Sequence, residues 1–435
     1  MRPGVDVISR ALPPPRSAPT DTGVAFVVGA TVETDVPYAL VHSMTEYVAV
    51  FGDRTGGEST YDWADTYFRE GGSRLYVASS SFVPGVFGGF TAEPPLGRAD
   101  FEAMRRDELD AYAVEKGIDP SQFSTKTQIV DALDAAGVAP LALDPTLQSA
   151  LDTLTKDLGP GQVAIADGAL AGDPANQAAL LAHAAKTNRV ALLSVVDGNA
   201  AALGASGVAL QAQQDGRYGA LFAPSAVVPG IVAGTTRNVP YTAVEAGIIA
   251  RNDLAYTPNQ PAAGELGQTL YAIDVNGRHT DVEYQTLNES GVNMARVIYG
   301  GVRTYGYRSC VDEATPTWLW FGWARLNMAI TAEAEAIGER YVFTQLDGRR
   351  RTISQFGGEL TAMLAPYYEA GALYGASAEE AYQVDVGVQV NTDATIAAGE
   401  LHAVISVRMS PGAEWVVIEI VKVATTQALP AAIAA

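Results

Sequence analysis

The chain has 435 residues, of which 48% are hydrophobic and 18% are charged. This is the composition of a folded globular protein with room for two or three domains, and it excludes a disordered or fibrous chain. The 28 Lys and Arg residues are outnumbered by 49 Asp and Glu residues, which gives a formal net charge of −21 at pH 7. A surface this negative repels phosphate groups, so we expect neither nucleic-acid binding nor attachment to an anionic membrane.

Several features bear on the compartment in which the protein is made. The single cysteine, Cys310, excludes an internal disulfide and a cysteine-based zinc site. Residues 1–19 hold five prolines and no apolar stretch of the kind that forms the core of a signal peptide. The longest uncharged run, between Arg217 and Arg237, contains prolines and glycines, which favours strand and loop over a membrane helix. We therefore expect a soluble protein without membrane insertion, made in a cytoplasm.

Residues 1–20 are expected to form an extended N-terminal linker arm. Five prolines remove backbone donors and bias the preceding residues to extended geometry, so this segment cannot be helical. Val5 and Val7 alternate with Asp6, which predicts a short strand with nothing local to pack against.

Apolar strands alternate with helices over residues 21–97 and 141–300. Strands are expected at 24–29, 74–78, 163–166, 190–196 and 219–223, and helices at 61–70, 174–187 and 199–213. This alternation is typical of a parallel sheet covered by helices. The sequence therefore predicts a central α/β domain with a partly parallel sheet.

Residues 98–140 interrupt this domain with two short helices, at 104–116 and 126–136. The segment resembles the small helix–extension–helix modules of the SAP and LEM type, some of which bind DNA. Here five basic residues stand against nine acidic ones, so the electrostatic contribution opposes DNA binding. The insert is expected to be a surface decoration, with a partner-binding role as the alternative.

Residues 301–414 are expected to combine helices with an antiparallel sheet. An apolar stripe predicts a helix over 319–341 whose other side is charged and includes Arg325 and Glu333, and a second helix is expected over 353–370. Two alternating segments, 382–390 and 401–409, predict half-buried strands with one face on a core.

The next segment, residues 415–423, is apolar on both faces apart from Glu419 and Lys422. A strand of this kind left as a free edge would template aggregation, so it needs more partners than one small sheet supplies. Residues 415–435 are therefore predicted to form a C-terminal linker arm.

A search for chemistry finds no clear site. Residues 52–59 (GDRTGGES) match the spacing of a phosphate-binding loop, but Glu58 stands where a lysine must neutralise phosphate charge, so a surface turn is expected. The four histidines have no second metal ligand at helical or loop spacing. We predict no catalytic residue, no metal and no cofactor.

Two aspartates leave an enzyme open as the alternative. Asp167 and Asp197 each follow an expected parallel strand, where open α/β sheets place active sites. Carboxylates there could hold a metal or act as an acid/base pair. Each aspartate is followed by glycine, however, which favours a turn or a helix cap.

One compact basic cluster stands out in this acidic chain. It consists of Arg349, Arg350 and Arg351 and follows an Asp-Gly pair. The cluster is either a solvated turn or an electrostatic contact with an acidic partner.

The order of motifs resembles that of the tail sheath proteins of contractile phages and related contractile injection systems. The resemblance begins with PGVDV, TDTGVAFVVGAT, PYALVHSMTEYVAVFG and YDWADTYFREGGSRLYVA. It continues with RYGALFAPSAVVPGIVAGTTRNVPYTAVEAGIIARNDLAYTPNQPAAGE and GVNMARVIYGGVRTYGYRS, and it ends with AYQVDVGVQVNTDATIAAGELHAVISVRMSPGAEWVVIEI. It covers nearly the whole chain outside residues 98–140.

The resemblance implies a two-part design, with an inner domain that contains both termini and outer α/β domains inserted in it. It also implies that the terminal arms add strands to the sheets of neighbouring protomers. The residues to which it assigns this strand addition are Val5, Val7, Trp415, Val417, Ile418, Val421 and Val423. Arg349, Arg350 and Arg351 would then be a possible contact with the tail tube.

The implied function is that of a structural subunit and not an enzyme. Such a subunit polymerises helically around a tail tube and contracts without nucleotide hydrolysis, which drives the tube through the target cell envelope. The implied partners are further copies of the chain, the tail tube protein, and the baseplate and tail terminator proteins. The implied location is a virion tail assembled in the cytoplasm of a host bacterium. The alternatives are an α/β enzyme near Asp167 and Asp197, or a tube or baseplate component.

Overall fold

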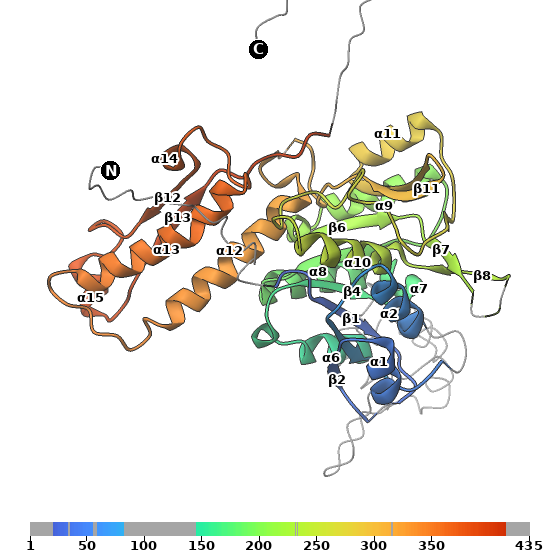
Figure 1. Cartoon of the computed structure of the whole chain (residues 1–435), viewed down its shortest axis with the longest axis horizontal. Coiled ribbons are helices and arrows are strands. Elements are labelled where there is room, and N and C mark those ends of the chain that lie inside the picture. The colour runs from blue at the N-terminus through green and yellow to red at the C-terminus, as the bar shows by residue number, and fades with distance from the viewer. Residues whose placement is uncertain are drawn as a thin grey trace, which may run out of the picture.

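The computed structural model describes residues 21–33, 35–54, 59–81, 145–230, 232, 234–314 and 316–414. The two expected arms and the insert at 98–140 lie outside the described residues. Figure 1 shows a large α/β part and a smaller part of helices and two strands. The long helix α12 (Phe321–Glu339) runs from one part into the other.

An eight-stranded sheet forms the centre of the large part, in the spatial order β11-β10-β6-β5-β4-β1-β3-β2. The strands are β1 (Ala25–Gly29), β2 (Tyr38–Val41), β3 (Leu75–Ser79), β4 (Gln162–Ile165), β5 (Val190–Ser194), β6 (Gly219–Ala223), β10 (Val292–Ile298) and β11 (Gly301–Tyr305). The six inner strands run parallel, and the outer strands β2 and β11 are antiparallel to their neighbours. The mixed α/β fold with a mostly parallel sheet is thus confirmed.

Helices cover both faces of this sheet, because the inner strands are apolar on both sides. Strand β1 shows the division: Ala25 and Val27 belong to the core on one face, and Phe26 and Val28 to the core on the other. The first core also takes residues from α1 (Met44–Phe51), α2 (Ser59–Arg69), α10 (Tyr241–Asp253) and the start of α12. The second takes residues from α6 (Pro145–Thr153), α7 (Gly168–Ala171), α8 (Pro174–Thr187), α9 (Ala200–Gln211) and α11 (Asp281–Glu289).

Shorter elements complete the large part. Strands β7 (Ala226–Pro229), β8 (Thr236–Val239) and β9 (Asp274–Val275) form a three-stranded sheet in the order β8-β7-β9. Single turns of 3₁₀ helix occur at Lys156–Leu158, Gly216–Tyr218 and Pro316–Trp318. None of the described helices combines the length and the apolar character that a membrane crossing needs.

The small part has its own core. Its elements are α13 (Arg351–Glu369), α14 (Ala378–Ala381), β12 (Tyr382–Asp385), α15 (Asp393–Ala397) and β13 (Val404–Val407). Leu326 and Ile330 of α12 and Leu364 of α13 form the centre of this core, on which one face of the strand pair packs.

The predicted strands 382–390 and 401–409 are shorter than expected. After Asp385 the chain turns, because the Asp385 carboxylate accepts the Gly387 amide at 2.7 Å and the Gly387 carbonyl accepts the Asn391 amide at 2.8 Å. The fully buried Asn391 also accepts the His402 amide at 2.8 Å, which holds residues before β13 outside the ladder. Side chain to backbone hydrogen bonds of this kind compete with strand pairing.

Candidate assembly interface

The strands β12 and β13 form a two-stranded antiparallel sheet, so each is an edge strand within the described part of the chain. Tyr382 pairs with Val407 and Val384 with Ile405. These four side chains are half-buried on the small core, whereas Gln383 and Val404 face outward. A sheet of two strands is marginal in water and gains stability by adding strands.

Along each strand, successive backbone amides point to opposite sides, so only alternate residues have amides available at the outer edge. The Arg408 amide donates to the Ala381 carbonyl at 2.8 Å, so in this register even-numbered β13 residues point their amides toward β12. The amides of Ile405 and Val407 therefore point away from the pair, as does that of Val384 on β12. An added chain can form a ladder with these groups.

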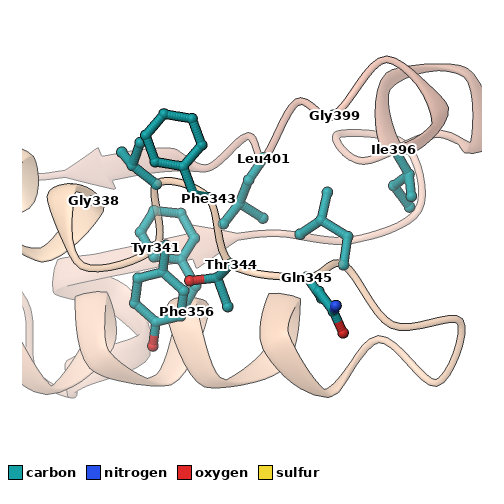
Figure 2. Close-up of a pocket in the computed structure, with 11 residues that line it drawn as sticks. Gly338, Tyr341, Phe343, Thr344, Gln345, Phe356, Ile396, Gly399 and Leu401 are labelled. Atoms are coloured by element: carbon teal, nitrogen blue, oxygen red, sulfur yellow. The ribbon is translucent and has the colours of Figure 1, made fainter.

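An apolar groove of about 650 Å³ lies beside this sheet, between the loop after α12, helix α13 and the loop after α15 (Figure 2). It is lined by Gly338, Tyr341, Val342, Phe343, Thr344, Gln345, Leu346, Phe356, Ile396, Gly399 and Leu401. Figure 2 shows Tyr341 and Phe356 packed together below the loop, and Phe343 pointing away from α13. Phe343 is fully exposed and has a φ of 63°, a backbone region that bulky residues rarely adopt.

The three arginines of the basic cluster differ in their surroundings. Arg350 donates to the Asn391 carbonyl at 3.0 Å, and Arg351 forms an ion pair with Asp347 at 3.0 Å. The hydrogen bond from Arg351 lowers the pKa of Asp347 below its usual value. Arg349 is exposed and has no hydrogen-bond or ion-pair partner among the described residues. It is the member of the cluster whose charge is available to a partner.

The two aspartates considered for catalysis both have structural partners. Asp167 is the N-cap of α7 and accepts the Ala169 and Leu170 amides, each at 2.9 Å. Asp197 accepts the Ser225 amide at 2.7 Å and the Asn276 side-chain amide at 2.6 Å. The described residues contain no cluster of His, Cys, Asp and Glu that could hold a metal ion.

The segment with phosphate-loop spacing joins two helices. Gly52 ends α1 with a φ of 86°, and Ser59 begins α2, while residues 55–58 lie outside the described residues. A phosphate-binding loop follows a strand instead.

A buried polar junction, which the sequence did not reveal, joins α12 to the large part. Arg325 is 1% exposed, and its guanidinium donates to Asp253 at 2.6 Å and to the Pro258 carbonyl at 2.8 Å. The sequence predicts a charged side of this helix that includes Arg325 and Glu333. These two side chains are buried, because the start of α12 is covered by the large part and its middle by α13. Glu333 is 5% exposed and accepts the Tyr367 hydroxyl.

A second buried carboxyl lies near this junction. Glu245 of α10 is fully buried and accepts the Thr304 hydroxyl at 2.5 Å, but its other oxygen has no hydrogen-bond partner among the described residues. Burial raises the pKa of Glu245 to about 8.

No protein-family model and no curated protein matches the chain. Solved structures do. A chain in the contracted helical sheath of the anti-feeding prophage superposes with a TM-score of 0.61 at 18% identity, over 96% of this chain and 98% of that chain. A chain of the contracted PVC sheath complex, from an extracellular contractile injection system, gives 0.61 at 15% identity over 97% of both chains.

The protein has the contractile sheath fold. The sheath tail protein from Desulfitobacterium hafniense shares it at a TM-score of 0.51 and 10% identity, over 88% of this chain and 93% of that chain. The resemblance to tail sheath proteins found in the sequence is therefore confirmed at the level of fold. The match extends through the large part, α12 and the small part.

Proposed function

We propose that the chain is a structural subunit of a contractile sheath. The observation that carries this proposal is the near end-to-end match to sheath chains at a TM-score of 0.61. The two open edges of the β12–β13 sheet support it, because they offer a place where another copy can pair. The nearby groove and the exposed Phe343 add apolar surface of the kind found at protein interfaces.

In this proposal neighbouring copies are linked by strand addition. The arms at residues 1–20 and 415–435 supply the strands, through Val5, Val7, Trp415, Val417, Ile418, Val421 and Val423. Each strand gains backbone hydrogen bonds and apolar burial. An arm that buries about 500 Å² of apolar surface contributes about 12 kcal/mol before ordering costs. Repeated head-to-tail links that do not close on themselves build a helix of subunits.

Contraction is proposed to be mechanical. Linked subunits rotate as rigid bodies between two packings, and the denser packing has the better interfaces. In this proposal contraction consumes no nucleotide. The proposed partners are a tail tube, contacted through Arg349, together with baseplate and terminator proteins, in the tail of a phage or of a related injection particle.

Electron microscopy of the purified full-length protein and of two truncations, lacking residues 1–20 or 415–435, tests this function. Full-length protein is expected to form hollow helical tubes of uniform width. Each truncation is expected to stay a folded monomer with an unchanged melting temperature, because in this proposal the arms pair with other copies of the chain. Normal tubes from both truncations would contradict strand addition, and a full-length protein that forms no ordered polymer would contradict the sheath function.

A further inference from the structure

Glu414 is held at the point where the C-terminal segment 415–435 begins. Its carboxylate accepts Nε of Arg308 at 3.0 Å and Nη2 of Arg308 at 2.7 Å, and it also accepts the Asn288 side-chain amide at 2.7 Å. The side chain of Arg308 is 6% exposed and that of Glu414 is 18% exposed. A bidentate ion pair shielded from solvent restricts both position and orientation more than a single hydrogen bond does.

Arg308 is in turn held by the large part. Its amide donates to the side-chain oxygen of Asn293 at 2.6 Å, and its carbonyl accepts the Asn293 side-chain amide at 2.7 Å. Asn293 is fully buried on β10, and Asn288 lies on α11. The Glu414 carboxylate is therefore fixed to the eight-stranded sheet and a helix that packs on it.

The chain reaches this point from the small part. After β13, the Ser410 carbonyl accepts the indole Nε1–H of Trp323 at 3.0 Å, near the start of α12. Four residues later Glu414 meets Arg308. The C-terminal segment thus starts on the large part, although the strand before it belongs to the small part.

We propose that Arg308 and Asn288 form a clamp on Glu414 that sets the starting point and direction of the C-terminal segment for pairing with a second copy of this chain. The inference rests on the proposed sheath function and adds positioning residues to it. A fixed starting point raises the effective concentration of the strand at its acceptor and lowers the entropy lost on pairing. It also transmits the pull of a neighbour to the large sheet.

The chain offers a matched control at Glu313. This carboxylate also faces Arg308, but at 3.7 Å and with 58% of its side chain exposed, and it is not attached to the C-terminal segment. Glu414→Ala removes the clamp, whereas Glu313→Ala removes a neighbouring charge of the same sign.

The first experiment measures the direction of the segment in the monomer. Nitroxide labels on Val282→Cys, which is exposed at the start of α11, and on Ile418→Cys report their separation by pulsed electron paramagnetic resonance. The native Cys310 is buried and leaves these sites as the reactive ones. The parent and Glu313→Ala are expected to give one narrow distance distribution, and Glu414→Ala a distribution at least twice as wide. Equal widths in all three would overturn the clamp.

The second experiment measures the protein concentration at which full-length protein begins to sediment as polymer. Under conditions in which every variant is fully folded, Glu414→Ala is expected to raise this concentration about tenfold, and Glu313→Ala to leave it unchanged. Assembly of Glu414→Ala at the parent's concentration would overturn the clamp while leaving the sheath function intact. A fall in the melting temperature of Glu414→Ala large enough to explain its weaker assembly would show that Glu414 stabilises the fold. That result would also overturn the clamp. Failure of the parent to polymerise would instead count against the sheath function, and the monomer distances would still decide the clamp.

Discussion

In the large part, residues 267–269 form hydrogen bonds with the outer edge of strand β11. The Thr269 amide donates to the Val302 carbonyl, and the Thr304 amide donates to the Gly267 carbonyl, both at 3.0 Å. In the small part, β12 and β13 have only each other among the described residues. The same chain thus protects an edge in one region and leaves two edges open in the other. The other outer strand of the large sheet, β2, pairs only with β3 among the described residues. Because open edges invite pairing, we expect β12 and β13 to be more available than β11 for contact with other chains.

The largest expected change in the free energy of unfolding comes from breaking the junction between the large part and the small part. Arg325→Met leaves Asp253 as a buried carboxylate without its cation, which should lower the free energy of unfolding by about 3 to 5 kcal/mol. Differential scanning calorimetry should show a lower melting temperature. The control is Arg340→Met at the other end of α12, where the side chain is 63% exposed and pairs with Glu359, so a change below about 1 kcal/mol is expected. Equal melting temperatures for both variants would contradict a buried junction.

An intermediate effect is expected from Glu245→Gln, and it depends on pH. Because the folded state holds the proton to about pH 8 and the unfolded state releases it near pH 4.5, the native protein loses stability as pH rises through that window. Glutamine mimics the neutral acid and avoids this cost. The variant should match the parent near pH 4.5 and exceed it by a few kcal/mol above pH 8, as measured by urea unfolding.

The partly exposed Glu283 serves as the control for this pH dependence. It is the capping-box residue of α11, and hydrogen bonds from Thr280 lower its pKa below the usual value. Its stabilising contribution is therefore present above the unfolded pKa and is lost at lower pH, which is the opposite sign. Glu283→Gln should accordingly be slightly less stable than the parent at neutral pH. A Glu245→Gln variant whose advantage does not grow with pH would contradict the raised pKa.

The smallest effect on the free energy of unfolding is expected at the basic cluster. Arg349→Glu should change it by less than about 0.5 kcal/mol, because the side chain is exposed and unpartnered among the described residues. If Arg349 contacts an acidic tube, the variant should bind tubes several-fold more weakly in a co-sedimentation assay and still form polymers by itself. Arg351→Glu is the control. It makes the same change of charge two residues away, but it also removes the partly exposed ion pair with Asp347. Comparing the two variants separates the effect of charge from the effect of losing that ion pair. Unchanged tube binding by Arg349→Glu would count against this contact.

Much of the fold follows from local patterns. The helix expected at 174–187 is observed with those bounds, because Asp173 caps its first turn, Pro174 suits its first position, and Asn188 ends it in a left-handed conformation. The strand expected at 219–223 is also observed with its bounds. Strands β2, β10 and β11 complete the sheet but were not among the expected ones. Strand β10 pairs with the distant β6, and β2 pairs with β3 across two helices, whereas β11 forms a local hairpin with β10.

Less of the candidate interface could be predicted. The residues assigned to strand addition lie outside the described residues, so that assignment stays a prediction. The alternating pattern of residues 382–390 favours one long strand, but Asp385 and Asn391 turn the chain after four residues. The clamp joins Glu414 to Arg308 across 106 positions, and no local signal marks either residue as a partner.

The amino-acid sequence by itself determined the α/β class, the inner strands other than β10, the long helix α12 and the resemblance to sheath proteins. These follow from apolar periodicity and motif order, which depend on neighbours within a few turns or strands. Only the tertiary structure decided which edges are covered, that the first half of α12 is buried on both faces, and where the C-terminal segment starts. Contacts between residues far apart in the chain form only when separate elements pack together. An arginine such as Arg325 or Arg308 also looks the same in the sequence whether its side chain faces water or a buried carboxylate.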